Sequence, residues 1–287
     1  VWLTAHRLSG HAQEVLPQVR ALCEDGVPEH LAFEIYYSYR QVDRELAARA
    51  ADVRARSEED PADRAEWNVI AVGLRAKQSG DARKLDALAR KLAPHASAWA
   101  ELSYSYMRLE RYADADRAAA RAFELDRHAN DAFTAWIEAL ERQNQIEKAI
   151  ACAEEFAAAR PYEHQGPERL GIILAKIARV DEALAHSARA MEAAPYCHVS
   201  QQSRALALFM SGDHDGALEY ARRSAGNEPP APDTDGSSDD ELLIAALTGD
   251  VAAVDRGLAA LEKSEPGAYP LYRARLVEVA AARAARG

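Results

Sequence analysis

The chain has 287 residues, of which 28% are charged and 48% hydrophobic, and its formal net charge at pH 7 is −11. This acidic balance argues against nucleic acid and anionic membrane as partners, because their phosphates repel a negatively charged protein. No segment reaches the ~20 uncharged apolar residues that cross a bilayer. Runs of β-branched residues are few, whereas Ala, Glu, Arg and Leu are abundant, which predicts an all-α fold.

Residues 1–28 resemble an incomplete pair of helices. The stretch before Gly10 predicts the tail of a first helix, Gly10 and His11 predict a turn, and a second helix is expected to end near Pro28. A complete first helix needs about one or two turns more, and the chain does not begin with Met. We therefore expect a truncated first repeat, with residue 1 inside a longer natural protein.

Two further pairs are predicted at 29–61 and 64–94. The first contains Tyr37 and Tyr39 around a serine, a motif that returns at Tyr104 and Tyr106. The pair at 64–94 is degenerate because its second helix is a few residues short. Gly80 followed by aspartate separates its two helices, since glycine supplies a left-handed cap and aspartate a helix start.

The centre of the chain repeats every 34 residues. Alanines at 115, 149, 183 and 217 keep this period, and prolines at 161, 195 and 229 recur in phase with them. A small residue is needed where two helices cross closely, and proline stops the second helix of each unit. The period predicts four two-helix units, at 96–129, 130–163, 164–197 and 198–231.

The C-terminal part departs from this period. Residues 227–241 are rich in Pro, Asp and Ser and predict a flexible insertion. A short helical pair is expected at 242–265, broken at Gly249, and a capping helix at 268–287. Because each unit of a solenoid packs only on its neighbours, the whole chain, 1–287, is predicted to form a single elongated domain.

The central units resemble the tetratricopeptide repeat, whose period is 34 residues. That consensus has large residues at positions 4, 7 and 11, small residues at 8, 20 and 27, and Pro at 32. The unit 96–129 matches with Trp99, Leu102, Ser103, Tyr106, Ala115 and Ala122, and it departs with Arg127 in place of proline. The resemblance implies a right-handed α-solenoid of about seven antiparallel helical hairpins with a C-terminal capping helix.

In tetratricopeptide proteins, positions 2, 5, 9, 12 and 13 of each unit face a concave groove. The resemblance therefore implies a non-enzymatic scaffold for protein–protein interaction that binds a peptide or protein segment there. Apolar and aromatic groups would give burial, and the basic groups would hold carboxylates of the partner. The expected groove residues are Tyr37, Tyr104, Met107, Arg108, Thr134, Glu138, Arg142, Glu168, Ile172, Lys176, Gln202, Leu206 and Phe209.

One branch of this family clamps the C-terminal carboxylate of a chaperone with Lys at position 5 and Asn at position 9. Here those positions hold Ala100 and Tyr104 in one unit and Thr134 and Glu138 in the next. We therefore do not expect binding of chaperone tails.

Residues suited to catalysis or metal binding are sparse. Cys23, Cys152 and Cys197 lie far apart without CxxC spacing, which predicts reduced thiols, a cytoplasmic protein and no metal site. His198 and His214 follow Cys197, but their spacing is more typical of turn residues. The sequence holds no GxxxxGK[ST], GxGxxG, GxSxG or HExxH motif. We therefore predict no catalytic residue and no cofactor.

Two alternatives stay open at the level of sequence. The chain could be the regulatory or substrate-recruiting arm of a multidomain enzyme, a glycosyltransferase or signalling NTPase, whose catalytic domain lies before residue 1. It could also self-associate through its terminal repeats, because the ends of a solenoid expose apolar faces unless they are capped.

Overall fold

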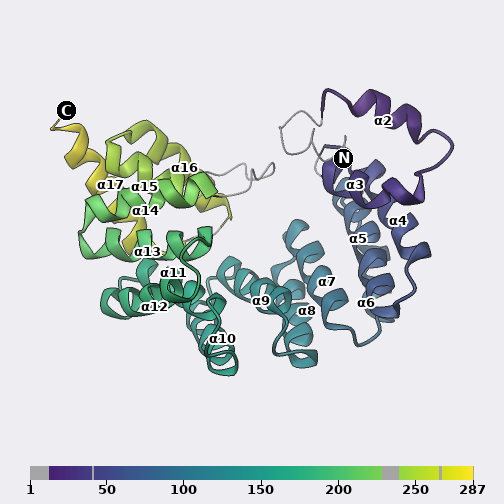
Figure 1. The fold of residues 1–287 in the computed structure, drawn as a ribbon, viewed down its shortest axis with the longest axis horizontal. Helices are drawn as coiled ribbons and strands as arrows, with labels where there is room; N and C mark the ends of the chain where they lie inside the picture. Colours follow the sequence, from purple (N-terminus) through teal and green to yellow (C-terminus); the bar gives the residue numbers. More distant parts are fainter. Residues whose placement is uncertain (1–12, 41, 228–238, 265–266, 287) are drawn as a thin grey trace. The chain divides into compact units, whose positions relative to one another are not determined.

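The computed structural model describes residues 13–40, 42–227, 239–264 and 267–286 (Figure 1). Within these ranges every regular element is an α-helix, and the helices pack in successive pairs. This confirms the predicted all-α solenoid fold. The chain divides into two compact units, Val1–Ala139 and Leu140–Gly287. The predicted turn at Gly10 lies outside the described residues.

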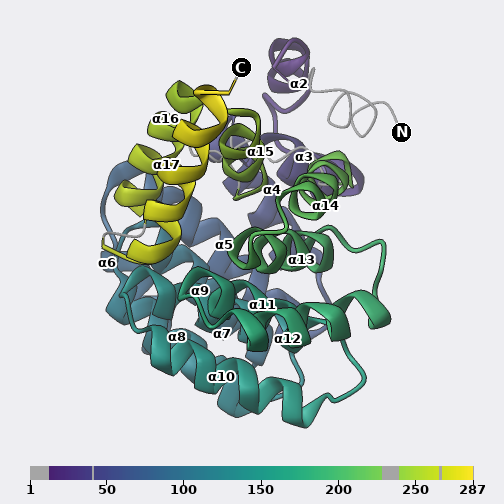
Figure 2. The same ribbon diagram turned by 90° about the vertical axis from the view of Figure 1, so that its left-hand side faces the viewer.

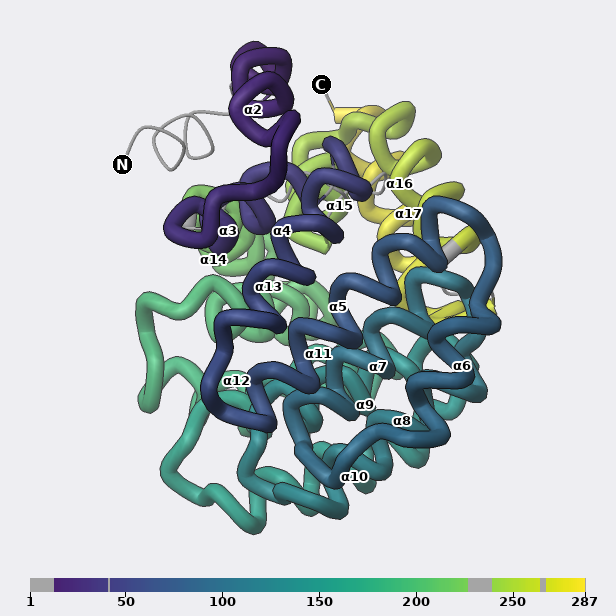
Figure 3. Tube along the Cα trace, turned by 90° about the vertical axis from the view of Figure 1, so that its right-hand side faces the viewer, coloured from purple at the N-terminus to yellow at the C-terminus, as the bar shows by residue number. Residues whose placement is uncertain are grey.

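The earliest helix in the described part of the first unit is a short one, α2, which belongs to the predicted truncated repeat. The helix pairs of this unit then follow one another along the chain (Figure 3). Their bounds are α2 (Leu16–Leu22), α3 (Glu29–Tyr39), α4 (Arg44–Ser57), α5 (Pro61–Ser79), α6 (Arg83–Ala89), α7 (Ala96–Arg108) and α8 (Tyr112–Leu125).

Local sequence explains where several of these helices begin and end. The carboxylates of Asp43 and Asp60 accept hydrogen bonds from the backbone at the starts of α4 and α5. Gly80 adopts a left-handed conformation, with φ of 70°, and ends α5. Helix α5 begins at Pro61, earlier than the predicted 64, because Asp60 caps it and proline is well suited to a first helical position.

Helix α9 (Asn130–Arg142) carries the boundary between the two units, and the second unit continues to the end of the chain. Its remaining helices are α10 (Ile146–Ala159), α11 (Gln165–Lys176), α12 (Val180–Ala193), α13 (His198–Ser211), α14 (His214–Asn227), α15 (Asp239–Thr248), α16 (Val251–Ser264) and α17 (Pro270–Ala284).

The predicted insertion at 227–241 differs from the structure at its end. Residues 228–238 lie outside the described residues, whereas Asp239 already opens α15. Three acidic residues in the first turn favour this helix start, because the N-terminal end of a helix carries partial positive charge. The sequence reading missed this start because it treated the acidic run as part of a solvated loop.

The alanine register of the four central units is visible in the core. Ala115, Ala149, Ala183 and Ala217 are all fully buried, and they lie in α8, α10, α12 and α14 respectively. First helices of consecutive units also approach closely. A Cβ added to Gly171 of α11 would come within 2.1 Å of the Ser203 hydroxyl of α13. Small residues are therefore required at these positions of the repeat.

The turns inside the central units repeat with the same period. Glu110, Asn144, Ala178 and Gly212 follow the first helix of each unit, and all four have left-handed backbones, with φ of 59°, 55°, 64° and 92°. In each turn the next residue donates a backbone hydrogen bond to a carbonyl five residues earlier, as in Arg111 to Tyr106. This bond pattern is the Schellman ending of a helix. Only the fourth unit has glycine there.

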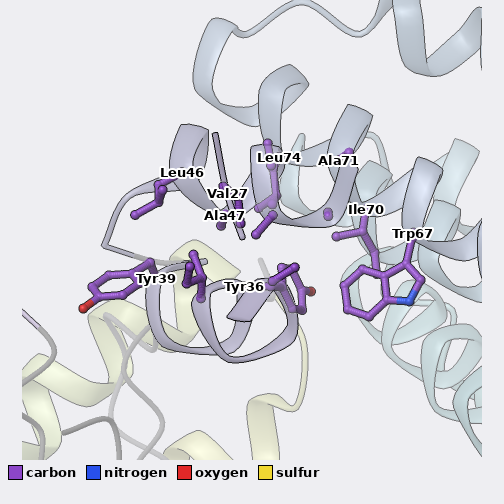
Figure 4. Packing of buried hydrophobic residues seen from close by; sticks show 14 of the residues in the cluster. Val27, Tyr36, Tyr39, Leu46, Ala47, Trp67, Ile70, Ala71 and Leu74 are labelled. Atoms are coloured by element: carbon purple, nitrogen blue, oxygen red, sulfur yellow. The ribbon is translucent and has the colours of Figure 1, made fainter. Parts of the chain in front are cut away.

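Aromatic residues anchor the core of the first unit (Figure 4). Trp67 of α5 meets Tyr36 of α3 edge to face, with 5.0 Å between ring centroids. Tyr39 is fully buried in the same cluster as Leu46 and Leu74. Each pair of rings of this kind adds about 0.5–1.5 kcal/mol beyond its burial. The packing of α3 against α5 therefore fixes the orientation of the side chains on the exposed faces of these two helices.

The left-handed turn makes a direct prediction for Gly212. Gly212→Ala should lower the free energy of unfolding by about 1 kcal/mol, because an L-residue is strained at positive φ. Chemical denaturation followed by circular dichroism measures this. The matched control is Gly226→Ala in α14, where an added Cβ meets nothing within 4 Å. A Gly212→Ala protein as stable as the control would contradict the turn geometry.

Candidate partner-binding surface

Helix α3 presents two aromatic rings to solvent. Phe33 is 48% exposed and Tyr37 is 37% exposed, and their ring centroids lie 4.6 Å apart. They are four residues apart and so share one face of the helix. The buried Tyr36 and Trp67 support this pair, with Tyr36 4.9 Å from Tyr37 and Trp67 6.3 Å from Phe33. The aromatic surface is therefore held by the core.

Arg40 extends this surface at the C-terminal end of α3. Its guanidinium carbon lies 5.1 Å from the centroid of the Tyr37 ring and 5.9 Å from that of Tyr36. Such cation–π contacts are worth about 0.5–1 kcal/mol at exposed sites. These contacts hold the Arg40 guanidinium group beside the rings of Tyr36 and Tyr37.

Helix α7 contributes Glu101, Tyr104 and Arg108, whose spacing places them on one face. Tyr104 is half-buried and Arg108 is exposed. The Glu101 Oε2 atom is inaccessible to solvent and accepts no hydrogen bond from the described residues. Burial raises the pKa of the Glu101 carboxyl, and Asp131 raises it further, whereas Arg108 and Arg40 lower it.

Side chains of α3 and α7 lie close enough for their charges to interact. Burial raises the pKa of the Tyr36 phenol, the charge of Glu101 adds to this, and Arg108 and Arg40 oppose it. The surface therefore combines two exposed rings with two guanidinium groups around a buried carboxyl. We call Phe33, Tyr37, Arg40, Tyr104 and Arg108 the α3–α7 surface.

The structure places the predicted groove residues of the first unit as follows. Tyr37 and Arg108 are exposed, whereas Tyr104, Met107, Thr134 and Glu138 are half-buried. Sequence reasoning missed Phe33, Arg40 and Glu101. Phe33 stands one helical turn before Tyr37, and this spacing could have revealed it. The burial of Glu101 depends on helices distant in sequence and has no such signal.

The predicted groove residues of the second unit are mostly covered. Arg142 and Gln202 are half-buried, whereas Glu168, Ile172 and Lys176 are each 4% exposed, and Leu206 and Phe209 are fully buried. These five side chains belong to the interior of the unit and do not form an open binding surface in this structure. The remaining open part of the predicted set lies in the first unit and at Arg142 and Gln202.

The chain's own C-terminal segment contacts two of these side chains, Lys176 and Phe209. Its helix α15 lies beside α13 and α14 (Figure 2). Lys176 Nζ of α11 lies 2.7 Å from Asp239 Oδ2 of α15, and it also lies 5.0 Å from the ring centroid of Tyr269. Tyr272 of α17 meets Phe209 of α13 edge to face at 6.3 Å. The repeat pattern could not foresee this packing, because Tyr269 and Tyr272 lie outside the period.

The Tyr269 hydroxyl also donates a hydrogen bond to the Glu141 carboxylate of α9. Tyr269 stands just before α17 with a left-handed backbone and is 2% exposed. Tyr269, with its strained left-handed backbone, therefore links the start of α17 to Glu141 of α9 and Lys176 of α11.

Possible metal ligands meet at one place in the described part of the chain. Cys197 lies beside His164 and Glu168, and the ligand atoms of all three are within 4.8 Å of one another. The set of Cys197, His198 and His214 that sequence analysis set aside does not assemble among the described residues. No helix in the described part combines the length and apolar character of a membrane span.

The buried carboxyl of Glu101 generates a prediction about pH. Its folded pKa lies above the 4.5 of an ordinary glutamate. Between 4.5 and the raised value the native state therefore binds more protons than the unfolded state, and stability falls as pH rises. Glu101→Gln should remove this loss. The melting temperature of the variant minus that of the wild type should therefore be larger at pH 7.5 than at pH 5.

Thermal unfolding at the two pH values measures this difference. Glu192→Gln, at an exposed position of α12, is the control, and it should show no comparable change. A Glu101→Gln difference that is constant with pH would contradict the buried carboxyl.

Comparison with known proteins supports the fold. No protein-family model and no curated protein matches the chain. A solved tetratricopeptide repeat protein from Parabacteroides merdae aligns over 88% of this chain and 98% of its own, with 11% identity and a TM-score of 0.54. PilF of Pseudomonas aeruginosa aligns over 75% and 97% with 18% identity and a TM-score of 0.47. PilW, a type IV pilus biogenesis factor, aligns over 76% and 100% with 17% identity and a TM-score of 0.48. The alignment with the Parabacteroides merdae protein shows that the chain has the fold of a tetratricopeptide repeat protein.

Proposed function

We propose that the chain is a non-enzymatic interaction scaffold that holds a segment of another protein against the α3–α7 surface. The observation that carries this proposal is the exposed pair Phe33 and Tyr37 with Arg40 stacked beside it. Exposed rings that the core supports lose little side-chain entropy on binding, so they are well suited to anchor a partner.

The residue types support the same conclusion. Aromatic residues and arginine are enriched at protein interfaces and dominate their binding energy. A repeat fold also offers extended surfaces built from successive helices. The proposed surface has both kinds of residue on two first helices, α3 and α7.

The charges indicate the chemistry of the bound segment. Arg40 and Arg108 are cationic, and their guanidinium groups bind carboxylates through paired hydrogen bonds. Burial raises the pKa of the neighbouring Glu101 carboxyl, although Arg108 and Arg40 lower it. We propose that the partner segment presents an apolar or aromatic side chain to the rings and a carboxylate to the guanidinium groups.

The reduced state of the cysteines indicates the cellular compartment of the protein. Cys23, Cys152 and Cys197 form no disulfide with one another in the structure, and reduced thiols are typical of reducing compartments. We therefore propose a cytoplasmic protein. A thiol-labelling experiment in cells of the source organism tests this, since full labelling without reductant supports it and blocked thiols would contradict it.

The function is tested with a Tyr104→Ala, Arg108→Ala double variant as bait in a pull-down beside the wild type. The variant should lose a partner that the wild type captures, while its helix content and melting temperature stay nearly unchanged. Tyr196→Ala with Arg222→Ala is the matched control, because both residues are exposed in the second unit. This control should retain the partner.

The two adverse outcomes have different meanings. If both double variants retain the partner, the α3–α7 surface is not the binding site. If the Tyr104→Ala, Arg108→Ala protein loses helix content, these residues support the core and the surface has been misassigned. Capture of no specific partner by the wild type would favour the arm of a larger enzyme.

A further inference from the structure

In the described part of the second unit, the buried carboxyl of Glu168 lies beside an imidazole and a thiol. Glu168, in the first turn of α11, is 4% exposed. Its Oε1 accepts a hydrogen bond from the Ser200 hydroxyl at 2.5 Å and lies 3.9 Å from His164 Nε2. A buried carboxylate is costly unless it is paired or coordinates a metal. The His164 imidazole beside Glu168 is itself a common metal ligand.

Three different donor types converge at this point. His164 offers an imidazole nitrogen, Glu168 a carboxylate oxygen and Cys197 a sulfur, all within 4.8 Å of one another. Burial raises the pKa of the Cys197 thiol, and the neighbouring Glu168 carboxyl raises it further. The thiol and the carboxyl therefore lie close together.

The repeat explains how these residues meet. His164 directly precedes α11, and Glu168 stands four residues later on the same helix face. Cys197 directly precedes α13, and α11 and α13 are neighbouring first helices that pack together. The period thus brings the starts of two consecutive units side by side. The separation of 33 residues along the chain hides the cluster from motif searches.

We propose that His164, Glu168 and Cys197 bind a zinc ion, with water as the fourth ligand. Zinc accepts nitrogen, oxygen and sulfur ligands in tetrahedral geometry, whereas a thiolate disfavours magnesium and calcium. Adjacent ligand atoms around tetrahedral zinc are separated by about 3.5 Å. The ligand atoms therefore need to approach one another by up to about 1.3 Å. His164 and Cys197 are half-buried, so their side chains have room to rotate.

The surroundings suit such an ion. Ser200 is fully buried, and its hydroxyl donates a hydrogen bond to the Glu168 carboxylate, which helps to fix the orientation of this side chain. Bonds of this kind from the second layer orient metal ligands. His164 and Cys197 are open enough for an ion to enter. The bound ion would tie the start of α11 to the start of α13.

The test is calorimetric titration of zinc chloride into the tag-free full chain at neutral pH. The wild type should bind one zinc ion, and Cys197→Ser and His164→Ala should weaken the affinity by about tenfold or more. The matched controls are Cys152→Ser, at a buried thiol of α10, and His128→Ala, at an exposed imidazole. Both controls should bind zinc as the wild type does.

Cobalt provides a second readout of the ligands. Co²⁺ bound at the site should give an absorption band from thiolate-to-metal charge transfer, and Cys197→Ser should abolish this band while circular dichroism shows an intact fold. The proposal is overturned if the wild type binds no zinc, or if Cys197→Ser binds zinc with unchanged affinity. It would equally fail if cobalt bound without the thiolate band.

Discussion

The close crossing of two helices within each unit is the constraint on which the rest of the structure depends. Ala115, Ala149, Ala183 and Ala217 are fully buried at this crossing, because a larger side chain would push the helices apart. Neighbouring first helices then pack together where α5 meets α7 and where α11 meets α13. Gly171 permits the same closeness between α11 and α13. The position of every first-helix side chain follows from these contacts.

The turn after each first helix is the second recurring element. Four residues of different types adopt the same left-handed conformation at Glu110, Asn144, Ala178 and Gly212. An L-residue in this conformation costs about 1–2 kcal/mol, so packing of the hairpin must outweigh local preference in the first three units. Tertiary contacts thus impose one backbone geometry on four unrelated residues, and the hairpins keep equal shape.

The first helices of the two units have different environments. In the first unit, Phe33 and Tyr37 stay exposed above a core built by Tyr36 and Trp67. In the second unit, Lys176 and Phe209 on the first helices are covered by Asp239, Tyr269 and Tyr272 of the C-terminal segment. The packed C-terminal segment stabilises Lys176 in a cage of one carboxylate and two rings. The same repeat therefore yields a surface in one unit and an interior in the other.

The sequence by itself determined the helical hairpins, the period and the small-residue positions, because these depend on contacts within one unit or between successive units. Gly80, Gly212 and the alanine series are visible as local patterns, and the structure has them where they were expected. Only the tertiary structure decided which first-helix side chains are open. The loss of solvent access at Glu101 Oε2 and the cover of Lys176 by Asp239 and Tyr269 depend on side-chain packing that the period does not specify. Local periodicity cannot encode such contacts, because they are set by the packing of distant parts of the chain.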